Sequence, residues 1–371
     1  MSEQKHILFL CGWYPSKVSP NNGDFIQRHA EAVLLNHKVS IIHIISDENS
    51  KKKIQYSAEK INGITTHIAY IKSTKNPFNK LFLFLKAFKE LLNNVGDFDF
   101  VHVNKLFPFG IFALFLKWFK NKEFIVSEHW TGYHEPQSKN ISSFEIFLSK
   151  IIAKNAKYLS PVSKDLQSSM EKLGLNGNYC IVPNVVDTNL FKPKNKKKEK
   201  FTILHASNML DKHKNVSGII KTIKKFSAFT QDFQLILVGE NSNQYQKLSD
   251  ELGVSKYIEF KDHVPHQTVV ELMQNSDVFV LFSNYENLPC VILESFSCGI
   301  PVISTNVGGI SEFFPNDFGF LITPNNESEL LEKLNHIYQN PNFDKEKLHL
   351  YATQNFGKKA IADAFSKLYF N

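Results

Sequence analysis

Short apolar segments with strand-like composition alternate along the chain with segments of helical periodicity. Such alternation is typical of a parallel sheet whose strands are joined by helices. One series of strands runs from residues 7–11 to residues 158–162, and a second series runs from residues 201–206 to residues 319–322. Because the two series are similar in length, we predict an α/β protein with two Rossmann-like, doubly wound domains that face each other across a cleft.

The domain boundaries follow from length and from one charged run. A chain of 371 residues is too long for one ordinary core and suits two domains. Residues 192–200 are mostly lysine without apolar periodicity, which indicates a linker. We expect domains at 1–191 and 201–355, with a final helix at 356–371 that packs back on the first domain.

The net charge of +7 comes almost wholly from lysine, since Arg28 is the only arginine. Most of these lysines can simply solvate surface helices, but they can also attract a nucleoside diphosphate or an anionic membrane leaflet. Nucleic acid is a poor candidate, because proteins that read it rely on arginine forks. The four cysteines show no metal-ligand spacing and suit a reducing compartment.

The apolar runs of the sequence do not indicate a membrane span. The apolar run near the amino terminus is too short for a signal peptide and resembles a first strand. The longest later run, residues 106–116, is well below the roughly 18–20 residues that a membrane span requires. We therefore expect a cytoplasmic protein.

The most informative stretch is residues 283–309. An apolar run at 278–282 predicts a buried strand, and residues 291–298 predict a short helix after a turn. Glu286 and Glu294 would thus lie at the carboxyl end of a strand, where open α/β sheets bind ligands. A carboxylate can accept two neighbouring hydroxyls, so Glu294 suits a ribose and Glu286 a second sugar. Helix capping is a simpler explanation for Glu286, but it does not explain Glu294.

Two further loops of the second half carry candidate ligand-binding groups. Asn208, Lys212 and Lys214 follow a predicted strand and precede a helix, where the helix dipole and the ammonium groups could hold a diphosphate. A solvated basic loop is the alternative. Around Val264, the backbone of residues 263–266 could approach a planar base.

The first half has two candidates, each with a structural alternative. Gly23 opens the first helix, so the amides there could bind an anion, although a long capped turn would have the same sequence. His129 follows a buried strand beside aromatic residues that could form a sugar platform. Histidines in such positions also serve as structural residues.

One motif suggests a metal site, but its position argues against this. Asp97 and Asp99 match the Asp-x-Asp pair that holds a divalent metal in one class of sugar-transferring enzymes. They precede a strand, whereas ligands gather at the carboxyl ends. We therefore interpret the pair as a capped turn and predict no metal and no cofactor.

Together these segments resemble the family-four (group 1) retaining glycosyltransferases, which use nucleotide sugars and have the two-domain GT-B fold. The resemblance spans most of the chain, and its most specific element is the glutamate pair with the Cys-Gly-x-Pro-Val segment after it. The matching segments are Gly23-Asp-Phe25, Glu128-His-Trp-Thr-Gly132, Val162-Ser163, Val182-Pro-Asn-Val-Val-Asp-Thr188, Lys214-Asn215, Val238-Gly239, Ser283-x-x-Glu286 with Glu294, Cys298-Gly-Ile-Pro-Val302 and Gly308-Gly-x-x-Glu312.

The resemblance implies a role for each candidate. Residues 1–191 would form the acceptor side and residues 201–355 the donor-binding domain, with a nucleoside-diphosphate sugar as co-substrate and a glycan or lipid-linked acceptor. Transfer would need no metal and would retain the configuration of the sugar. The implied catalytic residues are Glu286, His129 and Lys214. The implied donor-binding residues are Glu294, Lys212, Asn208, Gly23, Val264, Asn287, Leu288 and Pro289.

Other interpretations stay open. A non-hydrolysing sugar-nucleotide epimerase shares the architecture, and a nucleotide-binding module without turnover is a third possibility. Residues 81–92, 114–120 and 144–157 are lysine-rich amphipathic segments of the first half. An ordinary core-facing stripe with lysines in water explains them, and docking on an anionic membrane, near a lipid-linked acceptor, is the alternative hypothesis.

Overall fold

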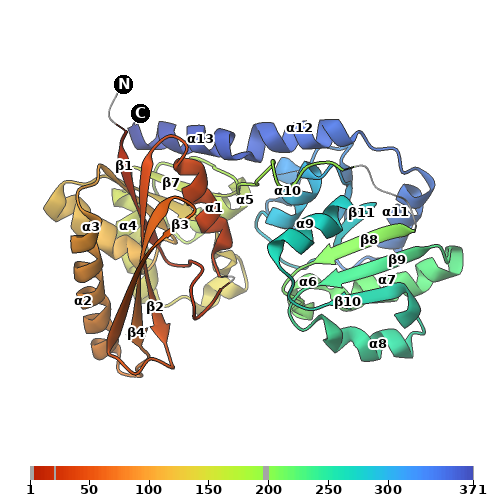
Figure 1. Ribbon diagram of the computed structural model, residues 1–371, viewed down its shortest axis with the longest axis horizontal. Coiled ribbons are helices and arrows are strands. Elements are labelled where there is room, and N and C mark those ends of the chain that lie inside the picture. Colours follow the sequence, from red (N-terminus) through yellow and green to blue (C-terminus); the bar gives the residue numbers. More distant parts are fainter. Residues whose placement is uncertain (1–3, 21, 195–199, 371) are drawn as a thin grey trace. The chain divides into compact units, whose positions relative to one another are not determined.

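The computed structural model describes residues 4–20, 22–194 and 200–370 and divides into two α/β units (Figure 1). The first unit contains the chain up to Val185 together with Lys358 onward, and the second contains Val186–Gly357. The division thus precedes the expected boundary at 191, because the Val186 N–H donates to the Phe356 carbonyl of the second unit and Phe191 is buried there. Of the expected linker, residues 195–199 lie outside the described residues.

The first unit contains a seven-stranded sheet in the order β3-β4-β2-β1-β5-β6-β7. Neighbouring strands are parallel except for the antiparallel pair β3 and β4. Strands β1, β5 and β6 are buried along their whole length, as expected where helices cover both faces. The strands are β1 (His6–Cys11), β2 (Lys38–Asp47), β3 (Ile54–Ile61), β4 (Ile64–Lys72), β5 (Phe100–Asn104), β6 (Phe124–Glu128) and β7 (Tyr158–Pro161).

Strand β3 is an element that the sequence analysis missed. It joins β4 through a two-residue turn at Asn62 and Gly63, whose φ angles are 49° and 86°. Two successive positive φ values are characteristic of the hairpin turn that Asn-Gly favours. The structure therefore adds an antiparallel edge hairpin to the predicted parallel sheet.

Helices cover both faces of the first sheet (Figure 1). α1 and α13 pack against each other, and the Tyr369 hydroxyl of α13 lies 2.7 Å from His102 Nδ1 of β5. α2, α3 and α4 follow β4, β5 and β6 and cover the opposite face. The helices are α1 (Asp24–Val33), α2 (Pro77–Val95), α3 (Phe109–Lys120), α4 (Ser143–Asn155), α5 (Lys164–Lys172) and α13 (Lys358–Phe370), with short 3-10 helices at Thr131–Tyr133 and Gln137–Asn140.

The second unit contains a six-stranded, wholly parallel sheet in the order β10-β9-β8-β11-β12-β13. The chain builds outward from β8 in one direction and then returns to place β11 on the other side of β8. The strand order therefore reverses between β8 and β11. The strands are β8 (Phe201–Ala206), β9 (Phe233–Val238), β10 (Ile258–Lys261), β11 (Val278–Leu281), β12 (Val302–Thr305) and β13 (Gly319–Ile322).

The helices of the second unit follow the predicted alternation, and the short α6 and α12 are additions to it. α12 was not expected, and it packs on α10 through Leu348, Ala352 and Phe356, which are buried at four-residue spacing. The helices are α6 (Asp211–Lys214), α7 (Val216–Phe229), α8 (Gln246–Glu251), α9 (His266–Gln274), α10 (Cys290–Ser297), α11 (Glu327–Gln339) and α12 (Lys345–Phe356), with 3-10 helices at Ser242–Tyr245, Ser255–Tyr257 and Ile310–Phe313.

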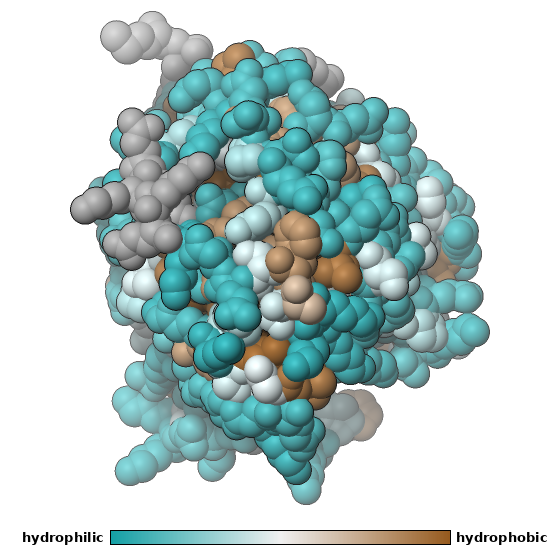
Figure 2. All heavy atoms as spheres, turned by 90° about the vertical axis from the view of Figure 1, so that its right-hand side faces the viewer, coloured by the Kyte–Doolittle hydropathy of each residue, from teal (hydrophilic) through white to brown (hydrophobic). Residues whose placement is uncertain are grey.

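The hydrophobic core is divided between the two units. Each unit has its own cluster of buried aliphatic and aromatic side chains. The face drawn in Figure 2 is mainly hydrophilic, with its hydrophobic side chains in small separate groups. Among the described residues, every helix is too short or too polar to cross a bilayer.

Buried histidines are a recurring feature of both sheets. Burial lowers the pKa of His29, His43 and His205 to about 4. A ring nitrogen of His43 lies 2.8 Å from the Cys11 carbonyl oxygen, and one of His205 lies 2.9 Å from that of Val280. Since a carbonyl oxygen can only accept, that nitrogen must carry the proton of the neutral ring.

These histidines predict loss of stability in mild acid. Below pH 6.5 the unfolded chain binds protons that the folded chain excludes, so the free energy of unfolding falls as pH drops from 6.5 towards 4. Each such histidine contributes a slope of about 1.4 kcal/mol per pH unit in that window. Urea unfolding at several pH values measures the slope. His43→Asn, which keeps a donor for the Cys11 carbonyl, should reduce it, and replacement of the exposed His263 should not. An equal slope in all three proteins would contradict this prediction.

Candidate functional site

The reversal of strand order in the second unit brings two predicted loops together. Val278 and Phe279 of β11 pair with Ile203 and Leu204 of β8. The chain leaves β8 towards α6 and α7, and it leaves β11 towards α10, so the two connections diverge from one edge of the sheet. In open α/β sheets this position is where ligands bind.

An ion pair joins these two loops. Lys214 Nζ, at the end of α6, lies 2.5 Å from Glu286 Oε1, in the loop after β11. The Ser283 hydroxyl donates to the same carboxylate oxygen over 2.7 Å. Both side chains of the pair are mostly buried, with exposed fractions of 16% for Lys214 and 9% for Glu286. The structure therefore brings together the lysine and the glutamate that the sequence indicated separately.

Backbone contacts fix the loop that carries Glu286. The Asn284 N–H donates to the His213 carbonyl over 2.7 Å, and the Asn284 side-chain amide donates to the Lys212 carbonyl over 3.1 Å. From the other side, the Thr305 hydroxyl donates to the Ser283 carbonyl over 2.6 Å. Glu286 is thus positioned by the loop after β8 and by the end of β12.

The loop after β12 closes tightly over Glu286, and only glycine fits there. Gly308 has a φ of 58°, and a Cβ at this position would lie 2.0 Å from the Glu286 carbonyl oxygen. The neighbouring Gly309 N–H donates to the Asn287 carbonyl over 3.0 Å. The Gly-Gly pair therefore allows one backbone to approach the other closely.

Glu294 lies on α10 and is 3% exposed, in agreement with the burial expected from the sequence. Burial and then the negative charge of Glu294 raise the pKa of the Cys298 thiol. Asn287 and Leu288 are also buried, and Pro289 stands at the N-cap position of α10. The side chain of Pro289 makes no capping hydrogen bond.

The remaining donor-side candidates lie at the same edge of the second sheet. Asn208 is exposed, and its side chain accepts from the Leu210 N–H over 3.3 Å. Lys212 is exposed on α6. Val264 is half-buried in the loop after β10, which is separated from β8 by β9. Val264 is therefore the candidate that the fold places farthest along the sheet from Lys214.

In the first unit, Gly23 stands at the N-cap of α1 with a φ of 80°. A Cβ there would lie 2.6 Å from the Trp13 carbonyl carbon, so glycine is required by packing alone. Asp24 in the first turn pairs with Arg28 at 2.7 Å and places a negative charge where an anion would bind. The geometry at Gly23 thus fits a tight turn, and its predicted contact with the donor stays a prediction.

His129 is packed into the first unit. Its ring centroid lies 4.7 Å from that of Phe25 and 5.2 Å from that of His29. Burial lowers the pKa of His129 well below its ordinary value, and the charge of nearby His29 lowers it further. A hydrogen bond with Asn184 opposes this shift. The ring is therefore neutral and firmly placed, and its predicted catalytic role is untested by this geometry.

Two residues beside His129 were not singled out as site residues in the sequence analysis. Glu128 accepts from the N–H groups of Leu106, His129 and Trp130 over 2.9–3.0 Å, so it holds the loop after β6 in place. Only its position in the matched segment could have indicated this. Lys105 has a φ of 79°, and its ammonium group lies over the rings of both Trp13 and Trp130.

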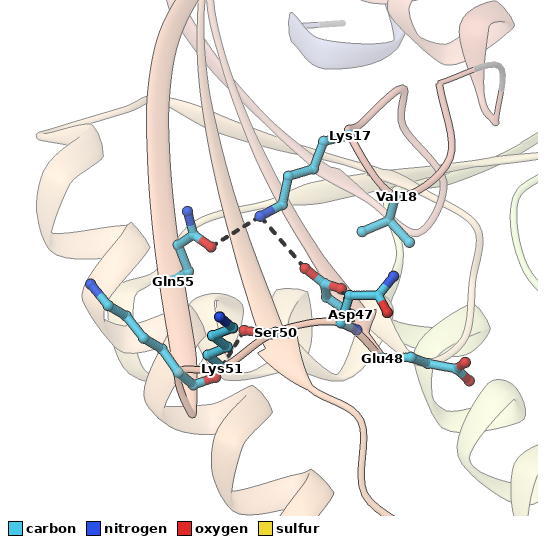
Figure 3. A pocket seen from close by; sticks show the side chains of 9 residues that line it. Lys17, Val18, Asp47, Glu48, Ser50, Lys51 and Gln55 are labelled. Carbon is cyan, nitrogen blue, oxygen red and sulfur yellow. Dashed lines mark hydrogen bonds and ion pairs between the residues drawn. The ribbon is translucent and has the colours of Figure 1, made fainter.

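A hollow of about 650 Å³ lies elsewhere in the first unit, beside the β3–β4 hairpin (Figure 3). Lys17 crosses it and lies 3.5 Å from Asp47 and 3.0 Å from the Gln55 side-chain oxygen. None of the candidate residues lines this hollow. Two of its charged groups, Lys17 and Asp47, already contact each other, and we assign the hollow no role.

The acidic pair at Asp97 and Asp99 binds lysines. Asp97 lies 3.0 Å from Lys122, and Asp99 lies 3.0 Å from Lys5 and accepts from the His6 N–H. Hydrogen bonds with Lys122 and His6, respectively, lower the pKa values of the two carboxyls. Over residues 4–20, 22–194 and 200–370, no group of three or more histidine, cysteine or acidic side chains could hold a metal.

Comparisons with known proteins match both halves of the chain. A family model for Glycosyltransferase Family 4 matches residues 26–190, and one for Glycosyl transferases group 1 matches residues 186–355. A Campylobacter jejuni N,N'-diacetylbacillosaminyl-diphospho-undecaprenol alpha-1,3-N-acetylgalactosaminyltransferase is 26% identical over 372 residues, which cover 92% of this chain and 96% of that protein. The GPI3 subunit of Saccharomyces cerevisiae phosphatidylinositol N-acetylglucosaminyltransferase is 22% identical over 203 residues, 52% of this chain. The match spans only 45% of that yeast protein.

Solved structures support the same fold. Sucrose-phosphate synthase from Thermosynechococcus elongatus superposes with a TM-score of 0.79 at 19% identity and 98% coverage of both chains. HepE from Anabaena, solved in complex with UDP, has a TM-score of 0.72 at 16% identity, with 98% of this chain and 99% of HepE covered. Since the two family models together span residues 26–355, the chain belongs to the family-four (group 1) glycosyltransferases, and its two units have the GT-B fold.

Proposed function

We propose that the protein moves a sugar from a nucleoside-diphosphate donor to a hydroxyl group of an acceptor, with retention of configuration and without a metal. The observation that carries the proposal is the Lys214–Glu286 pair at the β8/β11 edge, which is the ligand-binding position of such a sheet. Family membership supports the reaction class.

The pair supplies the two charges that such a transfer needs. In the reaction, the bond between the sugar C1 and the β-phosphate oxygen breaks, and the departing oxygen keeps the electron pair. The acceptor oxygen bonds to C1 on the same face, and its proton moves to a departing phosphate oxygen. Lys214 would stabilise the charge on the diphosphate, and Glu286 would hold the donor sugar. The ammonium of Lys214 can take over a charge role that a metal serves elsewhere.

Glu294 would bind the nucleoside part of the donor. Glu294 is buried, and its carboxylate can accept two hydroxyls at once, which a ribose diol offers from neighbouring carbons. Placement on α10, eight residues after Glu286, would separate the nucleoside from the transferred sugar. The two glutamates would therefore have different tasks, with Glu294 in donor affinity and Glu286 in turnover.

The acceptor would be a glycan or a lipid-linked sugar. The Campylobacter relative that covers most of this chain is named for transfer to a diphospho-undecaprenol-linked sugar. By analogy, we place the protein in the cytoplasm at the inner face of the cell membrane, in assembly of a bacterial surface polysaccharide or glycoconjugate.

Nucleoside diphosphates should stabilise the protein against heat. A ligand that binds only the folded state at about one hundred times its Kd adds about 2.7 kcal/mol, which raises Tm by several degrees. A thermal-shift screen of nucleoside diphosphates and nucleotide sugars, each with excess EDTA and with Mg²⁺, measures this. We expect equal shifts with EDTA and Mg²⁺, and smaller shifts with nucleoside monophosphates. No shift with any diphosphate would contradict the donor site, and a shift that requires Mg²⁺ would contradict metal independence.

The glutamates should separate affinity from turnover. Glu294→Ala should weaken nucleotide binding about tenfold, the loss of roughly one hydrogen bond to a charged group. Glu286→Gln should lower kcat about a hundredfold with little change in nucleotide Kd. Calorimetry and product analysis by mass spectrometry measure both effects, with the exposed Glu271→Gln as a matched control. Normal turnover in both variants would refute the assignment, and an isomeric nucleotide sugar as product would indicate an epimerase.

The tight turn over Glu286 gives a third prediction. Gly308→Ala combines a positive φ with a clash against the Glu286 carbonyl, so it should cost about 3 kcal/mol or more and weaken donor binding. Gly253→Ala is the matched control, because Gly253 has a φ of 67° and an added Cβ would meet only the Lys224 ammonium, 3.9 Å away, so only about 1 kcal/mol is expected. Chemical denaturation and nucleotide titration measure the two variants. Equal destabilisation by the two variants would show that the structure relieves the clash at Gly308 without cost, which would contradict this prediction.

A further inference from the structure

α2 carries two apolar stripes, and only one of them faces the sheet. Leu83 and Ala87 are buried against the first sheet, as a core-facing stripe requires. Phe78, Phe82 and Leu85, with spacings of four and three residues, are exposed, and Phe78 is 82% exposed. Such spacing places them on one face of the helix. The sequence analysis favoured a core-facing stripe alone, and the structure shows a second stripe in solvent.

α3 repeats the pattern of α2. Its residues Ile111, Phe115, Trp118 and Phe119 follow spacings of four, three and one, and all four are exposed. Phe119 is 72% exposed, and the rings of Phe115 and Phe119 lie 5.0 Å apart. A helix that is apolar on nearly every side is stable in water only if its outer face is covered. The described residues leave this face uncovered.

α4 extends the same layer. Phe144 and Phe147 are exposed on its first two turns. α2 and α3 are in contact through the stacked rings of Phe88 and Phe112, whose centroids lie 4.0 Å apart, and α3 packs on α4. The three helices thus form one layer on one face of the sheet (Figure 1), and their exposed side chains make up what we call the helical face. Exposed apolar groups gathered over one layer indicate an interaction site.

The helical face is also basic. α2, α3 and α4 contain seven lysines and two glutamates, a net charge of +5 in a chain whose total is +7. Lys80, Lys86 and Lys120 are exposed beside the apolar stripes. Aromatic side chains flanked by lysines are the composition of helices that lie in the interface of an anionic membrane.

The same charge argues against a second copy of this chain as the covering partner. A symmetric dimer through the helical face would bring Lys80, Lys86 and Lys120 of one copy close to the same lysines of the other. Like charges at an interface oppose association. An anionic bilayer offers both an apolar layer for the aromatic rings and negative headgroups for the lysines.

We infer that the helical face of α2, α3 and α4 docks the protein on an anionic lipid bilayer. The aromatic side chains enter the headgroup region, and the lysines contact anionic headgroups. This inference rests on the proposed function only in that a lipid-linked acceptor gives the docking a purpose. Binding to lipid can be measured with no donor or acceptor present.

Co-sedimentation of the full-length protein with vesicles tests the inference. We expect binding to vesicles of phosphatidylcholine with about one third phosphatidylglycerol, and at least tenfold weaker binding to pure phosphatidylcholine. Binding should also weaken in about 1 M NaCl, where the Debye length falls to about 3 Å. Failure of the wild type to bind anionic vesicles at low salt would overturn the inference.

Variants locate the surface. Phe82→Ser with Phe119→Ser should weaken vesicle binding at least tenfold, whereas Leu35→Ser with Leu350→Ser, which removes two exposed leucines elsewhere, should leave it unchanged. Lys80→Ala with Lys120→Ala should reduce the preference for anionic vesicles. All variants should retain the thermal shift with nucleotide, which shows that they fold and separates this test from that of the proposed function.

Three outcomes would count against this surface. Equal vesicle binding by the wild type and the Phe82/Phe119 variant would place the contact elsewhere. Equal losses in the aromatic variant and the leucine control would show a general effect of hydrophobicity. A dimer in sedimentation analysis that the aromatic variant dissociates, without vesicle binding, would assign the helical face to a second copy.

Discussion

The ammonium group of Lys214 and the carboxylate of Glu286 hold together two loops that lie far apart in the sequence. Parallel strands can be joined only by crossovers, and reversing the strand order between β8 and β11 sends these crossovers apart. These crossovers therefore do not cover the edge of the sheet between β8 and β11. Burying one of these charges without a counter-charge would cost several kcal/mol, so each residue offsets the desolvation cost of the other. A bound diphosphate would have to compete with Glu286 for Lys214, which links donor binding to the freedom of the glutamate.

The parallel strands could be predicted because both of their faces are buried, which makes each a short apolar run. β3 escaped prediction because it is an edge strand whose residues Ile54–Ile61 are mostly exposed. Its one clear signal was the Asn62-Gly63 turn. Alternation of buried and exposed residues thus gave no signal for this edge strand. α12 was also missed, although Leu348, Ala352 and Phe356 are buried at four-residue spacing.

The sequence indicated the candidate residues but not the contacts among them. Glu286 and Glu294 were recognisable because they follow an apolar strand, and the burial of Glu294 agreed with expectation. That Lys214 contacts Glu286 depends on the register of β8 against β11, which the sequence does not specify. The position of Lys105 between Trp13 and Trp130 depends on a positive φ that is unusual for lysine. Such contacts between loops that are distant in sequence can be identified only from the structure.

Periodicity also could not decide which side of α2 and α3 faces the sheet, since both helices are apolar on two sides. The sheet can cover only one stripe, so the exposed stripe reflects a requirement other than folding. Weak docking would satisfy that requirement. A protein and an acceptor that share one membrane layer meet at a much higher effective concentration than in solution. A few aromatic rings with lysines around them can then be enough for docking, and the protein can still dissociate from the membrane.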